Sequence, residues 1–573
     1  MRGVPLAVSS DRHGAAALGS ALAAWLAFAA LFGIPGFNLR EDGYLLTVAA
    51  RIRAGEVPYR DFAYIRPPLP LVVPLALLAW VPDHVVLVAR LYVTLQGAGM
   101  LVVVYALLVA AGVARSRAAL FALVGAVLAC TGGFPPAPWH TMDGVCYSAI
   151  TVAALAAAMA QRRPLLAFGA GAAAAGAALS KQGFVAVAMA GVAGTLTAEG
   201  RRVGRRPWSA LLAYVGGAAA VCLPLVFVLG STGALAAALQ AVVTDPREVT
   251  REVLGYGNWE LLVGMHLPSG TGLTVGLSLV LLCLGALRSR LALGLGLAMT
   301  AWLLAVFWTS RSVGRVLREF VLEPSYVLAW LGGIGLLAAH ALGRCRLPPW
   351  AACSLALALC TLYASVWSYV GVRSATFAFP VVVPLVVGLA GIAGTRPREA
   401  DPAPVLDPTG RGGRGPVLAL AALALVSVAG QLPTRVRYTA AFRTPGLLGV
   451  SSTPARVRSV DDVVALVRGE TRSGEPVFVL PDLPGFYFLA GRPNPTRVDW
   501  LLPQELSRAE IRRAVNDLER RPPRLVIVTD HDIFQHGPSR LRPILAYLGR
   551  RYVLAHRDGE LDVYRPRDAA AGS

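Results

Sequence analysis

Three acidic residues occupy positions from which they could transfer protons. Glu41 and Asp42 stand side by side in Asn38-Leu-Arg-Glu-Asp-Gly-Tyr44, shortly after the first apolar run of the chain. Asp143 lies in Pro135-Pro-Ala-Pro-Trp-His-Thr-Met-Asp-Gly144, between two later apolar runs. Carboxylates from two loops on one face of a membrane can converge above the helix ends, where one can act as a general base. These three residues are therefore the candidate catalytic groups, with Asp42 ahead of Glu41.

A single lysine is the most unusual feature of the composition. The chain has 53 basic residues, and Lys181 is the only one that is not arginine. It lies in Ser180-Lys-Gln-Gly183, at the end of an apolar run over 164–180. An ammonium is a compact point charge and a guanidinium is a planar fork, so the two are not interchangeable at a tight site. We expect Lys181 to contact a phosphate; the alternative is a lysine that reaches the membrane interface from a helix end.

The same loops carry further residues suited to substrate binding, and these are Tyr44, Arg60, Asp61, Arg66, Trp139 and His140. Each also has a structural alternative. Asp61 can pair with a neighbouring arginine, and Trp139 is of a type common at any membrane interface. Asp42 can cap a helix over 45–50, and Asp143 can cap a helix from about 145, because aspartate is favoured at helix starts.

The elements that must position these residues are membrane helices. Of 573 residues, 55% are hydrophobic and 15% are charged, and the mean hydropathy is +0.58. A soluble domain carries roughly 25% charged residues. The net charge of +20 does not indicate nucleic-acid binding, because the arginines fall in short clusters between apolar runs. That distribution is typical of the cytoplasmic loops of a membrane protein.

The apolar runs predict about thirteen spans within a membrane domain over 1–432. The expected spans are 14–36, 86–112, 117–133, 145–160, 164–180, 183–198, 209–230, 271–287, 291–308, 323–343, 347–372, 375–394 and 415–432. A fourteenth run, 67–81, is bounded by prolines and is expected to lie along the surface. With the N-terminus inside, most arginine clusters then fall on the cytoplasmic side. Loops 37–85 and 134–144 fall outside, on one face.

Two outside segments nevertheless carry several arginines. Residues 37–66 hold five and residues 309–322 hold three, namely Arg311, Arg315 and Arg318. Either nearby acidic residues pair with them, or they bind an anionic ligand, since guanidinium groups suit phosphate.

Residues 433–573 are expected to form an extracytoplasmic α/β domain. Strands are predicted at Val477-Phe-Val-Leu480, Leu525-Val-Ile-Val-Thr529, Tyr552-Val-Leu-Ala555 and Leu561-Asp-Val-Tyr564, with helices near 459–470, 507–520 and 539–549. Asp558-Gly559 is a strong hairpin signal between the last two strands. The seven cysteines show no metal-ligand spacing, and none lies in this domain. No cofactor is evident, and we expect either no metal or a loosely held divalent cation.

The order of these motifs resembles the C-type membrane glycosyltransferases, which have the GT-C fold. An acidic pair after the first span, then Gly55-Glu-Val-Pro-Tyr-Arg-Asp-Phe62 and Arg66-Pro-Pro-Leu69, is similar to the opening of the aminoarabinose-transferase and protein O-mannosyltransferase group. Asp143, the Lys181 turn and Asn494-Pro-Thr-Arg497 are similar too. In this family the acidic pair usually has the order Asp-Glu, whereas this chain has Glu41-Asp42.

The resemblance implies an inverting enzyme in the bacterial plasma (inner) membrane. It would move a sugar from a polyprenyl-phosphate carrier to a cell-envelope acceptor, which could be a lipid, a polysaccharide or a protein. A first-loop carboxylate would deprotonate the acceptor hydroxyl, and Asp143 would orient the acceptor, the sugar or a metal ion. The alternatives are a transporter or flippase of lipid-linked sugars, which needs no catalytic carboxylate, and a non-catalytic scaffold.

Overall fold

The computed structural model describes most of the chain in detail. The described residues are 12–132, 138–200, 208–246, 267–270, 272–273, 275–277, 318–367, 371–393, 414–502, 506–529, 533–536, 538–559 and 561–570. Every structural statement below concerns these residues.

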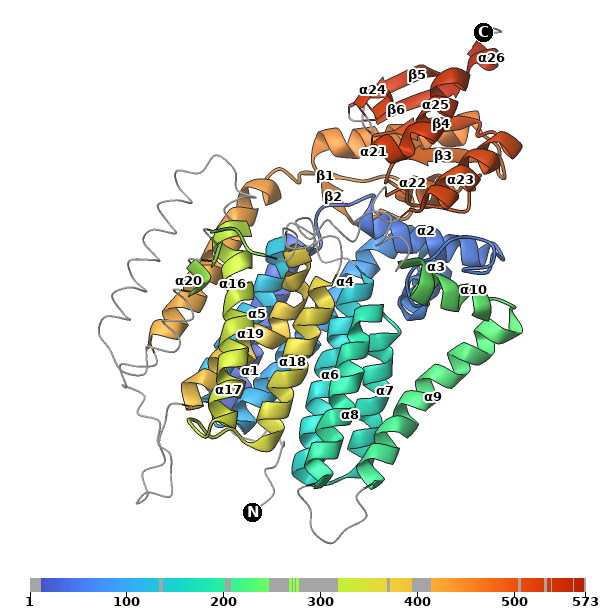
Figure 1. Ribbon diagram of the computed structural model, residues 1–573. Coiled ribbons are helices and arrows are strands. Elements are labelled where there is room, and N and C mark those ends of the chain that lie inside the picture. The colour runs from blue at the N-terminus through green and yellow to red at the C-terminus, as the bar shows by residue number, and fades with distance from the viewer. Residues whose placement is uncertain are drawn as a thin grey trace, which may run out of the picture.

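Long helices stand side by side and form a bundle (Figure 1). The bundle helices are α1 (Arg12–Phe28), α4 (Val85–Ala110), α5 (Arg115–Leu128), α6 (His140–Gln161), α7 (Pro164–Ala178), α8 (Val185–Gly200), α9 (Ser209–Ser231), α16 (Glu323–Val327) with α17 (Gly333–Ala341), α18 (Pro349–Val366), α19 (Phe379–Ala393) and α20 (Arg414–Arg435). Seven helical segments of the described chain are long and apolar enough to cross a membrane. The chain is therefore a polytopic helical membrane protein, as its hydropathy predicted.

The predicted number of thirteen spans stays a prediction. The expected span 291–308 lies outside the described residues, and only a few residues of 271–287 are described. Within the described chain, the apolar helices α7 and α8 are shorter than 18 residues.

Short helices cover one end of the bundle (Figure 1). They are α2 (Glu41–Arg53), α3 (Val72–Trp80) and α10 (Leu235–Leu239). Helix α3 falls within the apolar run 67–81. Its nine residues are about 14 Å long at 1.5 Å per residue, which is less than half of the ~30 Å hydrocarbon core. This run therefore does not form a helix that could span the bilayer, as the prolines at its ends predicted.

The C-terminal part of the chain is an α/β unit that lies over the same end of the bundle (Figure 1). Its four-stranded sheet has the order β3-β4-β6-β5. Strands β3 (Val477–Leu480) and β4 (Leu525–Val528) are parallel, whereas β6 (Leu561–Pro566) is antiparallel to both β4 and β5 (Tyr552–Asp558). All four strands lie where the sequence pattern predicted them. A short pair, β1 (Ala440–Ala441) with β2 (Ser451–Ser452), precedes the sheet.

Helices cover both faces of this sheet because its strands are apolar on both sides. Val479 and Ile527 share a core with α21 (Pro454–Glu470) and α22 (Gly485–Ala490). Phe478 and Val526 share a second core with α23 (Arg508–Arg520) and α25 (Arg542–Arg551). The first of these cores continues into Leu39, Leu46 and Val86 of the membrane part. The two parts of the chain thus share one hydrophobic core at their junction.

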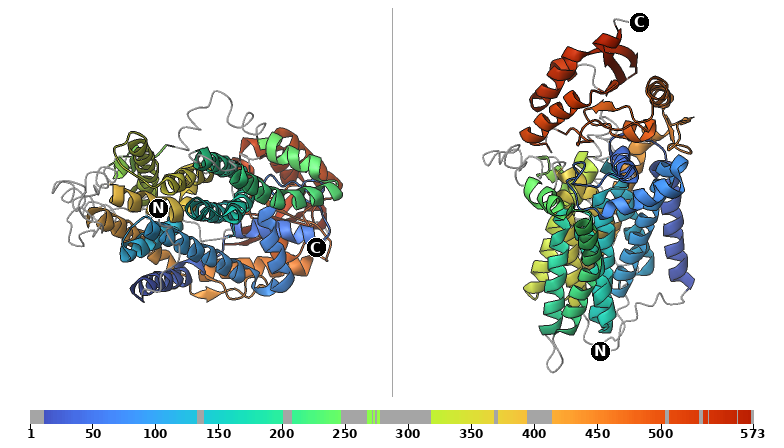
Figure 2. Two further views of the ribbon diagram at one scale, coloured as in Figure 1. Left: turned by 90° about the horizontal axis from the view of Figure 1, so that it is seen from below. Right: turned by 90° about the vertical axis from the view of Figure 1, so that its right-hand side faces the viewer.

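The start of α1 at Arg12 and the C-terminal unit lie at opposite ends of the molecule (Figure 2). Helix α4 starts at the end next to the C-terminal unit, since the backbone of Val86 donates a hydrogen bond to the carbonyl of Gly446. The α4–α5 connection, with Arg115 and Arg117, is therefore at the far end. The start of α6 and the end of α7 accordingly lie near the C-terminal unit, which brings Asp143 and Lys181 to the same end as α2.

Candidate active site

Asp42 is a buried carboxylate in the first turn of α2. Its Oδ2 accepts a hydrogen bond from the backbone N–H of Asn38 at 3.0 Å. Arg90 of α4 forms an ion pair with the same oxygen and donates from Nε to Oδ1 at 3.2 Å. Arg90 is itself 0% exposed and donates a further bond to the carbonyl of Gly33 at 2.8 Å. Asp42 therefore joins α2, α4 and the end of the first helix, and both of its oxygens have partners.

Glu41 has a different environment from its neighbour. One of its oxygens accepts a hydrogen bond from the side chain of Asn38. Burial raises the pKa of Glu41 to about 7, against the opposing effect of the Arg40 charge. A carboxyl group whose pKa is near the working pH is well suited to act as a general base. Glu41 thus has a pKa suited to proton transfer, whereas Asp42 is held in a buried ion pair.

Asp143 is in the first turn of α6 and is 5% exposed. Helix α6 begins at His140, so Asp143 does not cap it. Instead its Oδ1 accepts hydrogen bonds from the Gln96 side chain at 2.7 Å and from the Tyr92 hydroxyl at 3.1 Å. Among the described residues, no hydrogen bond to Oδ2 is found, which leaves that oxygen for a substrate. Helix α4 therefore holds both Asp42 and Asp143, through Arg90 and Gln96.

Two cationic side chains, Lys181 and Arg66, lie near His140. Lys181 follows α7, is 2% exposed, and donates from Nζ to the carbonyl of Ser365 at 3.1 Å. The charges of Lys181 and Arg66 both act on the imidazole of His140. The Tyr64 hydroxyl is close enough to Arg66 and Asp143 for both charges to act on it. Arg66 and Lys181, which were predicted from separate segments, thus lie near the same imidazole in the fold.

An aromatic cluster covers these groups, and its members are Tyr44, Tyr59, Tyr64, Trp139, His140 and Trp500. Ring centroids of Tyr44 and Trp500 are 4.8 Å apart, and those of Trp139 and His140 are 4.3 Å apart. Within the described chain, three buried polar atoms of this cluster have no hydrogen-bond partner: the Tyr64 hydroxyl, His140 Nδ1 and Trp500 Nε1. A buried polar atom without a partner costs about 1–3 kcal/mol, so these atoms are suited to a polar ligand.

The C-terminal unit holds the first loop (residues 37–85) in place. Arg51 of α2 forms an ion pair with Asp499 at 2.8 Å. Arg497 donates to the backbone carbonyls of Tyr59 at 3.1 Å and Arg60 at 2.8 Å. The backbone N–H of Ala63 donates back to the carbonyl of Arg497 at 2.8 Å. These bonds place Trp500 in the aromatic cluster.

Other predicted residues lie apart from the cationic group. Arg60 and Asp61 form an exposed ion pair at 2.8 Å, and hydrogen bonding to Arg60 lowers the pKa of Asp61 to about 2. Arg40 pairs with Asp482, and Arg318 pairs with Glu323 at 2.8 Å. Acidic partners thus account for these arginines of the outside segments. Arg311 and Arg315 lie outside the described residues.

Six residues of the site described above were missed by the sequence analysis: Tyr59, Tyr64, Arg90, Tyr92, Gln96 and Trp500. A signal for Arg90 was present, because a charged residue inside an apolar run is costly and usually faces a partner. Trp500 had no signal in the sequence, since its position depends on how the C-terminal unit docks. His, Cys, Asp and Glu side chains do not form a group of three or more suited to a metal in the described chain, and a loosely held cation stays a prediction.

Comparisons with protein-family models and with curated proteins find no match. Two solved structures of ArnT from Cupriavidus metallidurans are similar in layout over 96% of this chain and 97% of theirs, each with a TM-score of 0.42. The structure bound to undecaprenyl phosphate has 14% sequence identity, and the apo structure has 16%. The sequence resemblance had named the same transferase group. At this TM-score the similarity carries no information about the chemistry of the site.

Proposed function

We propose that this protein is a membrane glycosyltransferase that moves a sugar from a polyprenyl-phosphate carrier to a hydroxyl group of a cell-envelope acceptor, on the outer face of the membrane. The observation that carries the proposal is that the aromatic cluster brings two cations and a carboxylate together: Lys181 and Arg66 lie near its His140, and Arg66 and Asp143 lie near its Tyr64. This arrangement provides cations for a phosphate, a carboxylate for proton transfer and aromatic rings for a sugar.

The cationic group is suited to the phosphate of a lipid carrier. Lys181 and Arg66 lie at the end of the bundle that is next to the short helices, where a polyprenyl chain could stay in the lipid. When the sugar leaves, negative charge develops on the phosphate. Cations that are already in position stabilise this charge more in the transition state than in the ground state, which is the requirement for catalysis.

The proposed base is Asp143, through its unoccupied Oδ2. It removes the proton of the acceptor hydroxyl, whose oxygen then attacks the anomeric carbon. The bond from that carbon to the phosphate oxygen breaks, and polyprenyl phosphate leaves with the bonding electrons. Attack opposite the leaving group inverts the anomeric configuration. The raised pKa of Glu41 makes it the second candidate, whereas the pairing of Asp42 with Arg90 supports a positioning role for Asp42.

The test is a transfer assay with purified full-length protein in lipid nanodiscs. It uses radiolabelled polyprenyl-phosphate sugars as donors and delipidated cell envelope as the acceptor. Asp143→Asn should lower transfer by about 10²–10⁴, the usual loss for a general base, and should leave the binding of decaprenyl phosphate unchanged. Glu41→Gln is the matched control. Normal transfer in Asp143→Asn together with loss in Glu41→Gln would move the base to the first loop.

Binding of the carrier is measured separately from transfer. Decaprenyl phosphate should raise the melting temperature of the wild-type protein, and Lys181→Met should abolish the shift. Absence of any shift in the wild type, with no transfer from any donor, would refute the proposed function.

A further inference from the structure

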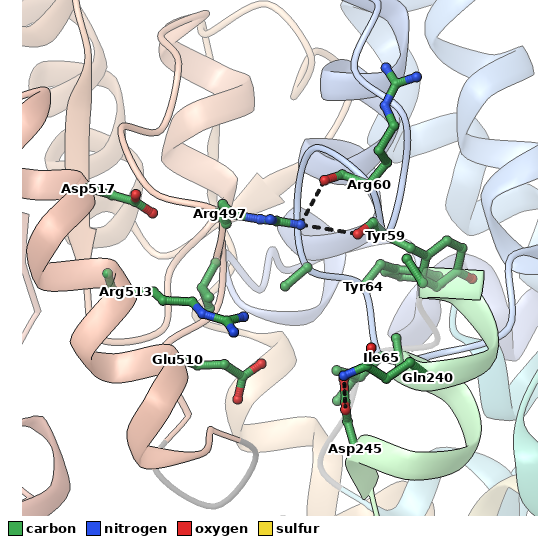
Figure 3. A pocket seen from close by; sticks show the side chains of 15 residues that line it. Tyr59, Arg60, Tyr64, Ile65, Gln240, Asp245, Arg497, Glu510, Arg513 and Asp517 are labelled. Carbon is green, nitrogen blue, oxygen red and sulfur yellow. Dashed lines mark hydrogen bonds between the residues drawn. The ribbon is translucent and has the colours of Figure 1, made fainter. Parts of the chain in front are cut away.

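A polar cavity of about 350 Å³ lies between the membrane part and the C-terminal unit (Figure 3). Three segments form its walls: the first loop at 59–65, the α10 region at 237–245, and the C-terminal unit at 497–498 with α23. Ligand sites usually have volumes of about 300–1,000 Å³. The cavity is therefore large enough for one or two sugar rings.

Charged side chains of both signs line the cavity. Its three carboxylates belong to Asp245, Glu510 and Asp517, and Arg497 and Arg513 supply guanidinium groups. Arg60 belongs to the wall, but its guanidinium points away from the cavity (Figure 3) and pairs with Asp61. An anionic ligand would gain little from such a lining, because the carboxylates would repel it. A neutral ligand rich in hydroxyl groups could use both kinds of side chain, since each hydroxyl donates one hydrogen bond and accepts others.

The walls are held in place before any ligand arrives. The two bonds from Arg497 to the first loop close one side (Figure 3). Gln240 donates to Asp245 at 3.4 Å on the other side. Tyr59 has a φ of 69°, a left-handed conformation that costs a residue with a side chain about 1–2 kcal/mol. Such strain is concentrated at functional sites, and here it occurs in a residue that lines the cavity.

Tyr64 connects the cavity to the candidate active site. It lines the cavity, belongs to the aromatic cluster, and is 1% exposed. Its hydroxyl has no hydrogen-bond partner in the described chain. The same hydroxyl is close enough to Asp143 for the charge of that carboxylate to act on it. A ligand in the cavity that reaches Tyr64 would therefore extend toward the proposed base.

We propose that this cavity binds neutral sugar residues of the acceptor, so that the acceptor is a glycan with uncharged rings next to its reacting hydroxyl. The proposal rests on the proposed function. It assigns a task to the C-terminal unit, because α23 and Arg497 supply part of the lining. Arg513 and Asp517 contact the acceptor and leave the carrier site untouched.

The test measures binding of neutral oligosaccharides to the purified full-length protein by native mass spectrometry in nanodiscs. The probes are mannose, galactose, glucose and arabinose oligosaccharides of two to six residues, each beside its phosphorylated form. The variants are Arg513→Ala and Asp517→Ala. The matched control is Arg512→Ala, an exposed arginine of the same helix that does not line the cavity. Decaprenyl phosphate binding is measured on all of them.

At least one neutral oligosaccharide should bind the wild type and the Arg512→Ala variant, and both cavity variants should bind it at least about tenfold more weakly. All four proteins should bind decaprenyl phosphate equally. Preference for phosphorylated probes, no binding of any neutral probe, or equal binding by the cavity variants would overturn the acceptor site. If decaprenyl phosphate binds normally in those cases, only the acceptor site is refuted; failure of the carrier to bind would refute the proposed function itself.

Discussion

Hydrogen-bond partners distinguish residues that look alike in the sequence. Asp42 and Asp143 are both buried aspartates in the first turn of a helix, yet Asp42 is paired with a buried arginine and Asp143 is held by two neutral donors. Both oxygens of Asp42 are therefore engaged, whereas Asp143 keeps one oxygen for a substrate. Removing one partner of a buried ion pair typically costs about 3–5 kcal/mol, so an Asp42 variant that loses activity is expected to lose stability as well.

Lys181→Arg is expected to lower transfer at least about tenfold, which corresponds to about 1.4 kcal/mol. Lys181 is 2% exposed and its Nζ contacts the carbonyl of Ser365. The larger, planar guanidinium would overfill this position and shift the charge. The measurement is turnover with a defined polyprenyl-phosphate donor, with Arg512→Lys as the conservative control at an exposed site. Wild-type turnover in Lys181→Arg would show that transfer does not require a lysine at this position.

The raised pKa of Glu41 predicts a pH-dependent stability. Its pKa in the folded protein is about 7 and its ordinary value is 4.5, so between these values the folded state binds more protons than the unfolded state. The free energy of unfolding contributed by this group therefore falls as pH rises from about 4.5 to 7. Glu41→Gln removes this dependence, and its advantage in melting temperature over the wild type should grow between pH 5 and 8. Parallel curves for the two proteins would contradict the raised pKa.

The sequence could identify Glu41, Asp143 and Lys181 because their residue types are rare beside apolar runs. It could not rank the carboxylates, since the ranking depends on partners from α4 that are distant in the chain. Arg90 could have been identified as a charge within an apolar run. The place of Trp500 depends on tertiary docking, which no local pattern encodes.

At the scale of elements, hydropathy and alternation identified the C-terminal strands and the short helix within 67–81. The four strands of the C-terminal sheet match the predicted apolar segments, and α3 is as short as the prolines around it implied. The start of α6 was placed near residue 145, but the helix begins at His140. That difference of one turn moves Asp143 from a cap into the helix and turns its side chain toward α4.

The contact between α2 and α22 gives a prediction at this scale. A Cβ atom on Gly43 would lie 2.4 Å from the Cα of Gly485, well below carbon–carbon contact distance. Gly43→Ala should therefore separate the two helices, with an overpacking cost of about 1–3 kcal/mol. Transfer should fall at least about tenfold, because the first loop and Trp500 would lose their alignment. Hydrogen exchange of residues 485–500 should increase.

The control for this variant is Gly99→Ala in α4, where a Cβ atom would meet nothing within 4 Å. It should keep both activity and exchange rates. Unchanged exchange at 485–500 in Gly43→Ala would mean that the two helices can part without loosening the C-terminal unit.

For the whole molecule, the arrangement of the ends determines which face carries the chemistry. The C-terminal unit lies at one end of the molecule, and α1 begins at the other (Figure 2). The candidate active site and the cavity are at the end with the C-terminal unit. Three helix connections are on the side away from the C-terminal unit: α4–α5, α6–α7 and α17–α18. Arg115 and Arg117 lie in the first turn of α5, and the other two connections contain Arg162 and Arg163, and Arg344 and Arg346. Arginine-rich short loops stay in the cytoplasm. The active site is therefore expected on the outer face.

Cysteine labelling in intact cells tests this topology. Ser473 in the C-terminal unit and Ser116 at the start of α5 are both exposed, so each can be replaced by cysteine without disturbing a core. A membrane-impermeant maleimide should label Ser473→Cys in intact cells and Ser116→Cys only after permeabilisation, measured against a parent with its native cysteines replaced by serine. Ser459 is unsuitable, since it is 7% exposed and its hydroxyl donates to the carbonyl of Asp558. Labelling of Ser116→Cys alone in intact cells would invert the orientation, and the carrier-linked donor would then have to be used on the cytoplasmic face.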